Sequence, residues 1–319
     1  MGIFASRWFR LAVSLGLLTA VVWLADWRSI WSVLREVDGR WVWCAFMLGL
    51  LDRAVLTYRW KVLLDVRGLD LRFAKLLRLQ LAANLLGSFL PSSLGVDAIR
   101  IAALCRSGLP ATEVVATTLL DRASIVVGTL VFGSITMLAL AGTRLPANLF
   151  LSVLLATGAV VAVCLVALLP GVRKWGGASL LPWLPARIRD RVAEVARATL
   201  AYRHEPATLL WISAVTVAIF MIRLCFAKMV VLACGADVAF MDLLLVIPIL
   251  WIVVMLPITV GGIGLQEAGY VALMGVFGIT PAIAVSMSII EHVVNRAVSL
   301  PGAFFLGDVT GATSPDASP

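Results

Sequence analysis

Apolar runs of membrane-spanning length recur along this chain of 319 residues. With their flanks, they approach or exceed the roughly 20 apolar residues that a helix needs to cross a bilayer. They lie at 11–25, 42–50, 125–141, 149–169, 209–222 and 243–256. Hydrophobic residues make up 61% of the chain and charged residues 14%, which is more apolar surface than a soluble domain can bury. The pattern predicts an all-α integral membrane protein.

The apolar segment at 242–277 is interrupted near its middle by the run LPITVGGIGLQE at 256–267. Proline lacks a backbone N–H group and glycine is the weakest ordinary helix former, so the helix should stop here and restart. An earlier interruption reads LPSSLGVDAIR at 90–100. Broken backbone at membrane depth is tolerated only where it is buried in protein or lines a wet cavity. We therefore expect two re-entrant broken-helix hairpins whose tips, around Pro91 and Pro257, form a binding site.

The two interruptions belong to a predicted internal repeat. Segment 61–73 matches 228–240 at an offset of 167 residues, and 121–122 falls on 291–292 at an offset of 170. Each copy consists of a span, a broken hairpin and a second span. Three full spans separate the starts of the copies if the first hairpin returns to its own side. The copies are then inverted in the membrane, an arrangement typical of transporters.

The repeat predicts about six transmembrane helices plus the two hairpins, arranged in five regions. These are an N-terminal span and outside loop at 1–40, the first repeat at 41–141, a linking span and basic cytoplasmic connector at 142–206, the second repeat at 207–306, and a disordered tail at 307–319.

The 26 Lys and Arg residues exceed the 18 Asp and Glu residues, which gives a formal charge of +8. They are spread through short loops without neighbouring stacking aromatics, so no nucleic-acid partner is expected. With a cytoplasmic N-terminus, the inside loops hold fifteen Lys and Arg residues and the outside loops four. This asymmetry predicts a multi-pass inner-membrane protein with both termini in the cytoplasm. The basic piece at 186–202 is compatible with a helix on an anionic membrane surface and equally with a solvated linker.

Charged and polar residues within the spans and beside the breaks are the candidate site. An ion at the bilayer centre costs about 2.5–3.5 kcal/mol on insertion scales, so such residues are functional candidates by default. The candidates for substrate binding are Ser92, Ser93, Asp97, Arg100, Asp121, Arg122, Thr259, Gly261, Gly262, Gln266, Glu267, Glu291 and Arg296. Weaker candidates are Asn84, Arg59, Arg223 and His292.

Several candidates also have a purely structural interpretation. Arg59 lies towards a predicted helix end, where snorkelling would explain its charge. Asp121 and Arg122 are compatible with an ion pair that locks the helix bundle. His292 is either a proton carrier or a hydrogen-bonded structural histidine.

Signatures of soluble enzymes are absent from the sequence. It has no phosphate-binding loop of the Gly-x-x-x-x-Gly-Lys type, no His-Glu-x-x-His and no Gly-x-Ser-x-Gly. Its five cysteines show no Cys-x-x-Cys spacing, so neither a disulfide framework nor a metal site is indicated. We therefore expect no enzyme activity, no catalytic residues, no cofactor and no metal.

Four segments together resemble a known family. They are RW at 59–60, PSSLG at 91–95 followed by Arg100, DR at 121–122, and above all LPITVGGIGLQE at 256–267. The chain resembles, over about 8–306, the lysylphosphatidylglycerol synthase transmembrane-region family, also called flippase-like domain proteins. Asp121 stands where that family's pattern has a glutamate, which keeps the charge but shortens its reach.

The resemblance implies a function in lipid movement. In fused members of the family, such a domain moves an aminoacylated phospholipid between leaflets while a separate soluble domain makes that lipid. Because this chain ends soon after its last span, we expect no synthase activity. We expect a flippase or transporter for an anionic or aminoacylated phospholipid, or another lipid-linked headgroup, with coupling to ions or protons left open. The alternative is a non-transporting membrane scaffold for a lipid- or glycan-modifying enzyme.

Overall fold

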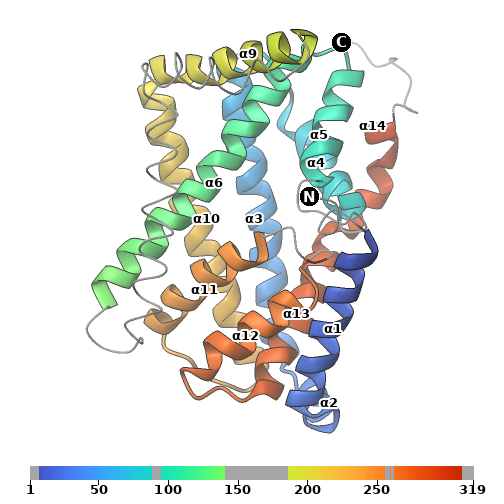
Figure 1. Cartoon of the computed structure of the whole chain (residues 1–319), viewed down its shortest axis with the longest axis vertical. Coiled ribbons are helices and arrows are strands. Elements are labelled where there is room, and N and C mark those ends of the chain that lie inside the picture. The colour runs from blue at the N-terminus through green and yellow to red at the C-terminus, as the bar shows by residue number, and fades with distance from the viewer. Residues whose placement is uncertain (1–6, 88–94, 141–185, 256–258, 260–261, 311–319) are drawn as a thin grey trace. The chain divides into compact units, whose positions relative to one another are not determined.

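The computed structural model describes residues 7–87, 95–140, 186–255, 259 and 262–310, and every regular element in these ranges is helical (Figure 1). The elements are α1 (Arg7–Ala25), α2 (Trp27–Arg35), α3 (Gly39–Val66), α4 (Phe73–Gly87), α5 (Gly95–Arg106), α6 (Ala111–Leu140), α9 (Ala186–Ala201), η2 (Tyr202–His204), α10 (Pro206–Ala233), α11 (Phe240–Met255), α12 (Leu265–Gly275), α13 (Pro281–Ser299), η3 (Leu300–Phe305) and α14 (Leu306–Thr310). The predicted all-α class is confirmed.

Four helical segments of the described chain are long and apolar enough to cross a membrane. They are Gly39–Val66, Ala111–Thr136, Pro206–Ala233 and Pro281–Val309. A fifth results if α1 and α2, which are bent by 79° at their junction, form one span. The protein is therefore a multi-pass membrane protein. The predicted span at 149–169 lies outside the described residues, so the total of about six spans stays a prediction.

Helix α2 occupies part of the segment that the sequence analysis expects as an outside loop. Asp26 caps it with a backbone φ of 57°, and its carboxylate accepts hydrogen bonds from the Arg28 N–H at 3.4 Å and the Ser29 hydroxyl at 3.1 Å. Ile30 is buried, whereas Trp31 is exposed. The segment is thus an amphipathic helix. Its mixed charges favoured a loop in the sequence analysis, and its narrow apolar face was missed.

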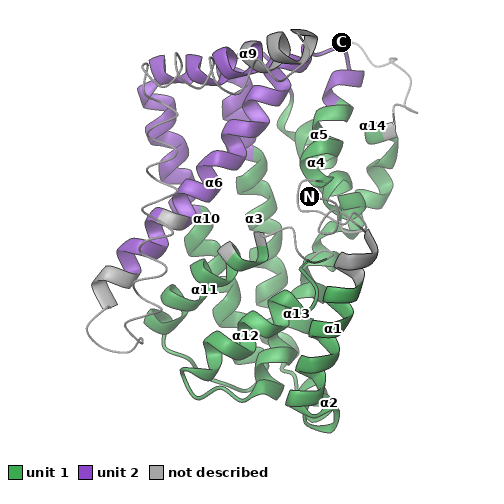
Figure 2. Cartoon of the chain, viewed as in Figure 1, with its two compact units in different colours: residues 1–57, 72–103, 219–319 green, residues 58–71, 104–218 purple. Residues whose placement is uncertain are grey.

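The chain forms two compact units (Figure 2). Unit 1 comprises Met1–Thr57, Arg72–Ala103 and Ile219–Pro319, and unit 2 comprises Tyr58–Leu71 and Leu104–Ala218. Each unit therefore draws on both halves of the sequence. Helix α3 begins in unit 1 and ends in unit 2, whereas α10 begins in unit 2 and ends in unit 1.

Helices α3 and α10 run antiparallel within unit 1. The Asp38 N–H donates to the Ala233 carbonyl at 3.1 Å, and Asp52 pairs with Arg223 at 2.8 Å. The residue numbers of these contacts increase along α3 and decrease along α10, so the two helices run in opposite directions. Between these contacts Gly49 allows close packing, because a Cβ there would lie 2.9 Å from a methyl carbon of Val298. Leu224, Val230 and Met287 belong to the large apolar core around these helices.

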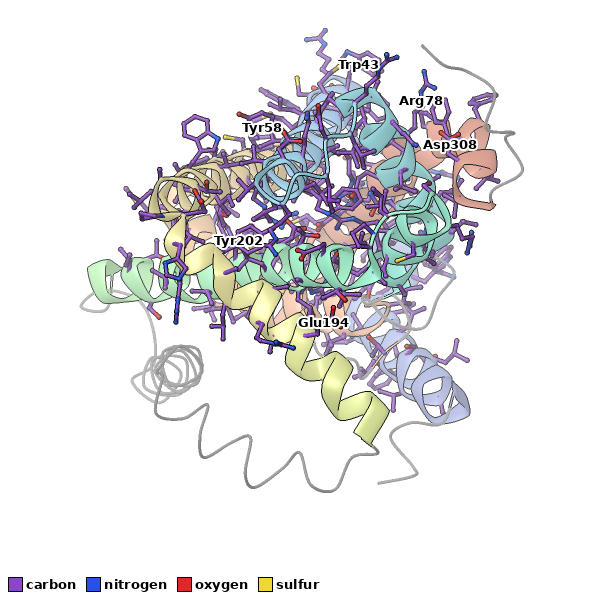
Figure 3. All side chains as sticks on the ribbon, turned by 90° about the horizontal axis from the view of Figure 1, so that it is seen from above. Trp43, Tyr58, Arg78, Glu194, Tyr202 and Asp308 are labelled. Carbon is purple, nitrogen blue, oxygen red and sulfur yellow. The ribbon has the colours of Figure 1, made fainter. Side chains whose placement is uncertain are left out.

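Unit 2 is held by buried polar contacts as well as by apolar packing. Helix α9 crosses α6 (Figure 3). Just after α9, Tyr202 donates its hydroxyl to the Leu63 carbonyl at 2.7 Å, and both residues pack with Ile212. The Arg67 guanidinium makes two hydrogen bonds to the Glu113 carboxylate, at 2.5 and 2.8 Å. These contacts tie the ends of α3 and α6 to the α9–α10 junction.

The starts of the helices recur between the two halves of the sequence. Helices α3 and α10 each have 28 residues and begin 167 positions apart, as do α4 and α11. Helices α5 and α12 begin 170 positions apart, as do α6 and α13. These starts agree with both offsets on which the predicted repeat rests.

The turns after α3 and α10 are also alike. Gly68 and Gly235 both have a φ of 72°, and each donates its N–H to the carbonyl three residues earlier, at 2.9 and 3.0 Å. Left-handed backbone at the end of a helix favours glycine because it has no Cβ.

An ion pair spans each of these turns at matching positions. Lys61 Nζ lies 3.3 Å from Asp70 in the first half, and Lys228 bonds to Asp237 in the second. Both pairs join a lysine of the long helix to an aspartate nine residues later.

Candidate functional site

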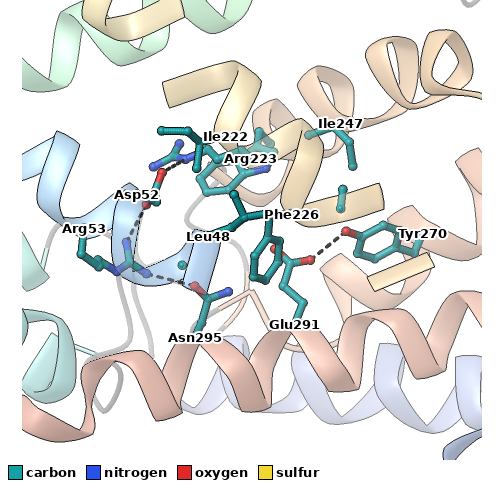
Figure 4. Close-up of a pocket in the computed structure, with 13 residues that line it drawn as sticks. Leu48, Asp52, Arg53, Ile222, Arg223, Phe226, Ile247, Tyr270, Glu291 and Asn295 are labelled. Carbon is teal, nitrogen blue, oxygen red and sulfur yellow. Dashed lines mark hydrogen bonds and ion pairs between the residues drawn. The ribbon is translucent and has the colours of Figure 1, made fainter. Parts of the chain in front are cut away.

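A small cavity in unit 1 lies among α3, α10, α11, α12 and α13 (Figure 4). Its charged lining residues are Asp52 and Arg53 of α3, Arg223 of α10 and Glu291 of α13. The free space at its centre is about 30 Å³, which is room for about two water molecules. The structure therefore describes a small site with four ionisable groups in its walls.

Two arginines share one carboxylate on one side of the cavity. Asp52 accepts a hydrogen bond from Arg223 Nε at 2.8 Å and a longer one from Arg53 Nη1 at 3.4 Å. Arg53 Nη2 donates to Asn295 Oδ1 at 3.0 Å, and the Arg223 guanidinium lies 4.2 Å from the centre of the Trp251 ring. This side holds two cations and one anion, so its net charge is positive.

The other side of the cavity carries Glu291, whose hydrogen-bond donors in the described part of the chain are both neutral. Tyr270 donates its hydroxyl to Glu291 Oε2 at 2.7 Å, and the Gln266 amide donates to the same oxygen at 2.9 Å. Within the described ranges no cation lies at ion-pair distance from Glu291, and its Oε1 receives no hydrogen bond. One carboxylate oxygen is thus left to accept from a guest.

Glu267 has a different environment, at the start of α12. Its Oε2 accepts the Gly264 N–H at 2.6 Å, and its Oε1 accepts the Ser288 hydroxyl at 3.0 Å. His292 Nε2 lies 3.2 Å from the same Oε1, although the two atoms are not aligned as a hydrogen bond. A carboxylate in the first turn satisfies free backbone N–H groups and interacts favourably with the helix dipole. Glu267 therefore holds the restart of the broken helix against α13.

Arg59 and Asp121 form a buried ion pair in unit 2. Arg59 Nε and Nη2 lie 3.0 and 2.7 Å from Asp121 Oδ1, and Arg59 Nη1 donates to the Thr216 hydroxyl at 3.1 Å. Arg59 Nη2 also donates to the Asp121 backbone carbonyl at 3.2 Å. This geometry matches the structural interpretation of Asp121, with Arg59 as its partner.

Arg296 is exposed on α13, whereas its neighbour Asn295 lines the cavity. Asp97 and Arg100 pair at 3.3 Å on α5, and Arg100 is buried. Thr259 is buried, and its hydroxyl has no hydrogen-bond partner in the described chain. The remaining candidates are Arg122 and Asn84, which are half-buried, Gly262, which has a φ of 81°, and Ser92, Ser93 and Gly261, which lie outside the described residues.

The structure brings Gln266, Glu291 and Arg223 of the predicted set to the cavity or its wall. Sequence reasoning did not select Tyr270 or Asn295. Helical spacing carried a signal for both, because each lies four positions after a selected residue, Gln266 or Glu291, and so on the same helix face.

A model of the family described as "Lysylphosphatidylglycerol synthase TM region" matches residues 7–302 of the chain. No curated protein matches the sequence. The family match includes all the helices that line the cavity.

Proposed function

The chain belongs to the lysylphosphatidylglycerol synthase transmembrane-region family, and from this premise we propose that it moves a phospholipid or another lipid-linked headgroup across the membrane. The family indicates a membrane domain with a lipid-related function. On this proposal the protein lies in the cell inner membrane with both termini in the cytoplasm and acts as a transporter. The headgroup passes through the cavity of unit 1 while the acyl chains stay in the bilayer.

The observation that carries the proposal is the gathering of four ionisable residues on one cavity, all of them from helices long and apolar enough to cross a membrane. Asp52, Arg53, Arg223 and Glu291 all belong to segments of membrane-spanning length. Each charge is costly there, at about 2.5–3.5 kcal/mol on insertion scales. A polar cavity inside spanning helices suits a substrate whose headgroup must cross an apolar layer.

The two arginines offer a site for the headgroup phosphate. Arg53 and Arg223 both direct guanidinium nitrogens to Asp52, at 3.4 and 2.8 Å. Guanidinium groups form paired, charge-assisted hydrogen bonds with phosphate oxygens. A phosphate that entered beside Asp52 would accept hydrogen bonds that the two arginines now make to the Asp52 carboxylate. Neither arginine would then lose an anionic partner.

The helix arrangement supports alternating access. In unit 1 the antiparallel course of α3 and α10, the first helices of the two predicted repeats, is the relation that inverted repeats require. Between α11 and α12 the chain is not helical at Thr259 or at 262–264. Since about 30 Å³ of free space cannot hold a headgroup, the helices around the cavity must separate to admit one.

Reconstitution in liposomes tests the proposal. Fluorescent phospholipids that are anionic or zwitterionic would be placed in both leaflets, and dithionite quenching would report those that reach the outside. We expect fast loss of the inner-leaflet signal with the wild type. Arg223→Met removes a charge-assisted hydrogen bond worth about 1.5–3 kcal/mol, so it should slow the movement about 10- to 100-fold.

Arg296→Ala is the matched control, because Arg296 is an exposed cation on a cavity-lining helix. Equal slowing of lipid movement by Arg223→Met and Arg296→Ala would show that the headgroup site is not in the cavity. No movement of any lipid, with and without a pH gradient, would contradict transport and favour the alternative of a non-transporting scaffold.

A further inference from the structure

Three residues that meet in unit 2 have counterparts that meet in unit 1. The counterparts follow from the helix starts, at 167 positions between α3 and α10 and 170 between α6 and α13. The pairs are Arg59 with Phe226, Gly49 with Thr216, and Asp121 with Glu291.

In unit 2 the three residues form a closed polar cluster. Arg59 bonds to Asp121 through two nitrogens and to the Thr216 hydroxyl through a third, at 2.7–3.1 Å. The Arg59 side chain has no exposed surface. The carboxylate, the guanidinium and the hydroxyl therefore fill their own space and satisfy one another.

In unit 1 the same three positions line the cavity. Phe226 stands in the place of the arginine, Gly49 in the place of the threonine, and Glu291 keeps the carboxylate (Figure 4). Unit 1 thus keeps the carboxylate but has neither an arginine nor a threonine at the two other matching positions. In unit 1 these positions border the cavity, whereas in unit 2 the arginine side chain is fully buried.

We propose that this end of the cavity binds an organic cation, an ammonium or guanidinium group, which takes the position that Arg59 holds in unit 2. Glu291 Oε1 accepts its hydrogen bonds, since Tyr270 and Gln266 both donate to Oε2. The inference deepens the proposed function and rests on it where the cation is said to belong to a lipid headgroup.

The walls around Glu291 fit a cation better than a second anion or an apolar group. Phe226, Trp251 and Tyr270 also line the cavity, and aromatic faces attract cations electrostatically. The nearby Arg223 is held by Asp52 at 2.8 Å and by the face of Trp251. With the two arginines at one end and Glu291 at the other, the cavity matches a group that carries an anion and a cation together.

Binding of free cations tests the site without any lipid movement. The purified full chain in detergent would be titrated with ethylammonium chloride and with guanidinium chloride at millimolar concentrations, against potassium chloride at equal ionic strength. Binding to the folded state raises the unfolding temperature with ligand concentration. We expect a rise of several degrees for the wild type with one or both organic cations and none with potassium.

Two variants should abolish the rise for different reasons. Phe226→Arg restores the arginine of unit 2, so an internal guanidinium occupies Glu291, and Glu291→Gln removes the negative charge. Arg296→Ala, at an exposed position of α13 outside the cavity lining, is the control and should retain the response. A wild type that responds to neither organic cation, or a response that survives in Phe226→Arg and in Glu291→Gln, would overturn the inference.

Liposomes then separate a lipid-borne cation from a free one. Phosphatidylethanolamine carries a primary ammonium, whereas phosphatidylglycerol carries none. If the site serves a lipid, wild-type protein should move the first faster than the second, and Phe226→Arg should remove the difference. Cation binding without movement of either lipid would assign the site to a free cation and contradict only the transport proposal. Equal movement of both lipids by wild type and Phe226→Arg would overturn the assignment of the cation to a lipid headgroup and leave transport standing.

Discussion

Arg59 and Asp121, 62 positions apart in the chain, form an ion pair whose side chains are 0% and 6% exposed, with Arg59 Nη2 2.7 Å from Asp121 Oδ1. Both charges are satisfied, since the arginine also bonds to Thr216 and to a backbone carbonyl. Buried pairs of this kind are costly to break, because removing one partner leaves an uncompensated charge. The pair therefore stabilises unit 2, whereas the matching positions of unit 1 line a cavity.

Replacing Arg59 by alanine should destabilise the protein strongly. Removal of one partner from a buried pair costs about 3–5 kcal/mol, so the unfolding temperature of Arg59→Ala in detergent should fall by many degrees. The double variant Arg59→Met with Asp121→Leu removes both charges and should recover much of this loss. Arg203→Ala, at an exposed arginine, should leave the temperature unchanged. A similar small effect for Arg59→Ala and Arg203→Ala would contradict the locking role.

Glu267→Ala should loosen the start of α12. The change removes the acceptor of the Gly264 N–H and of the buried Ser288 hydroxyl, and unsatisfied buried groups cost about 1–3 kcal/mol each. Hydrogen–deuterium exchange followed by mass spectrometry should show faster exchange in peptides that cover 264–270. Glu194→Ala, on the exposed side of α9, is the control and should leave these peptides unchanged. Unaltered protection in Glu267→Ala would show that the carboxylate does not hold the helix start.

The predicted inversion of the two repeats implies opposite labelling of two matched positions. Asp70 and Asp237 follow the first helix of each repeat, and their side chains are 92% and 81% exposed. In a variant without the native cysteines, a cysteine at Asp237 should react with an impermeant maleimide in intact cells. A cysteine at Asp70 should react only after the membrane is opened. Labelling of both from the same side would contradict the inversion.

Cys234 should be unreactive in the folded protein over the ordinary pH range. Burial raises the pKa of this thiol to about 12, against an ordinary value of 9.0. Because the folded state favours the protonated thiol, its contribution to stability is complete below about pH 9 and is lost as the pH rises towards 12.

A variant that keeps only Cys234 would test this. It should react slowly with maleimide at pH 8, and quickly at the same pH once the chain is unfolded in dodecyl sulfate. Equal rates in the two states would show that the thiol is not buried.

Local and linear features of the sequence were enough for the class of the fold. The length of an apolar run is set by the thickness of a bilayer, so a multi-pass all-α protein follows from the sequence alone. Helix α11 ends at Met255 and α12 begins at Leu265, on either side of the proline and glycines that disfavour a helix. The offsets of 167 and 170 appear in the sequence and again in the helix starts.

Only the tertiary structure decided which charges meet. A helix turns by about 100° per residue, so one position separates Asn295 in the cavity wall from Arg296 at the surface. The sequence contained both Asp121 and Glu291 within apolar helices, but it could not show that Asp121 has an arginine partner whereas Glu291 has none among the residues that the structure describes. That difference depends on which side chain of a neighbouring helix faces each carboxylate, Arg59 in unit 2 and Phe226 in unit 1, and such facing is fixed by packing between segments that are far apart in the chain.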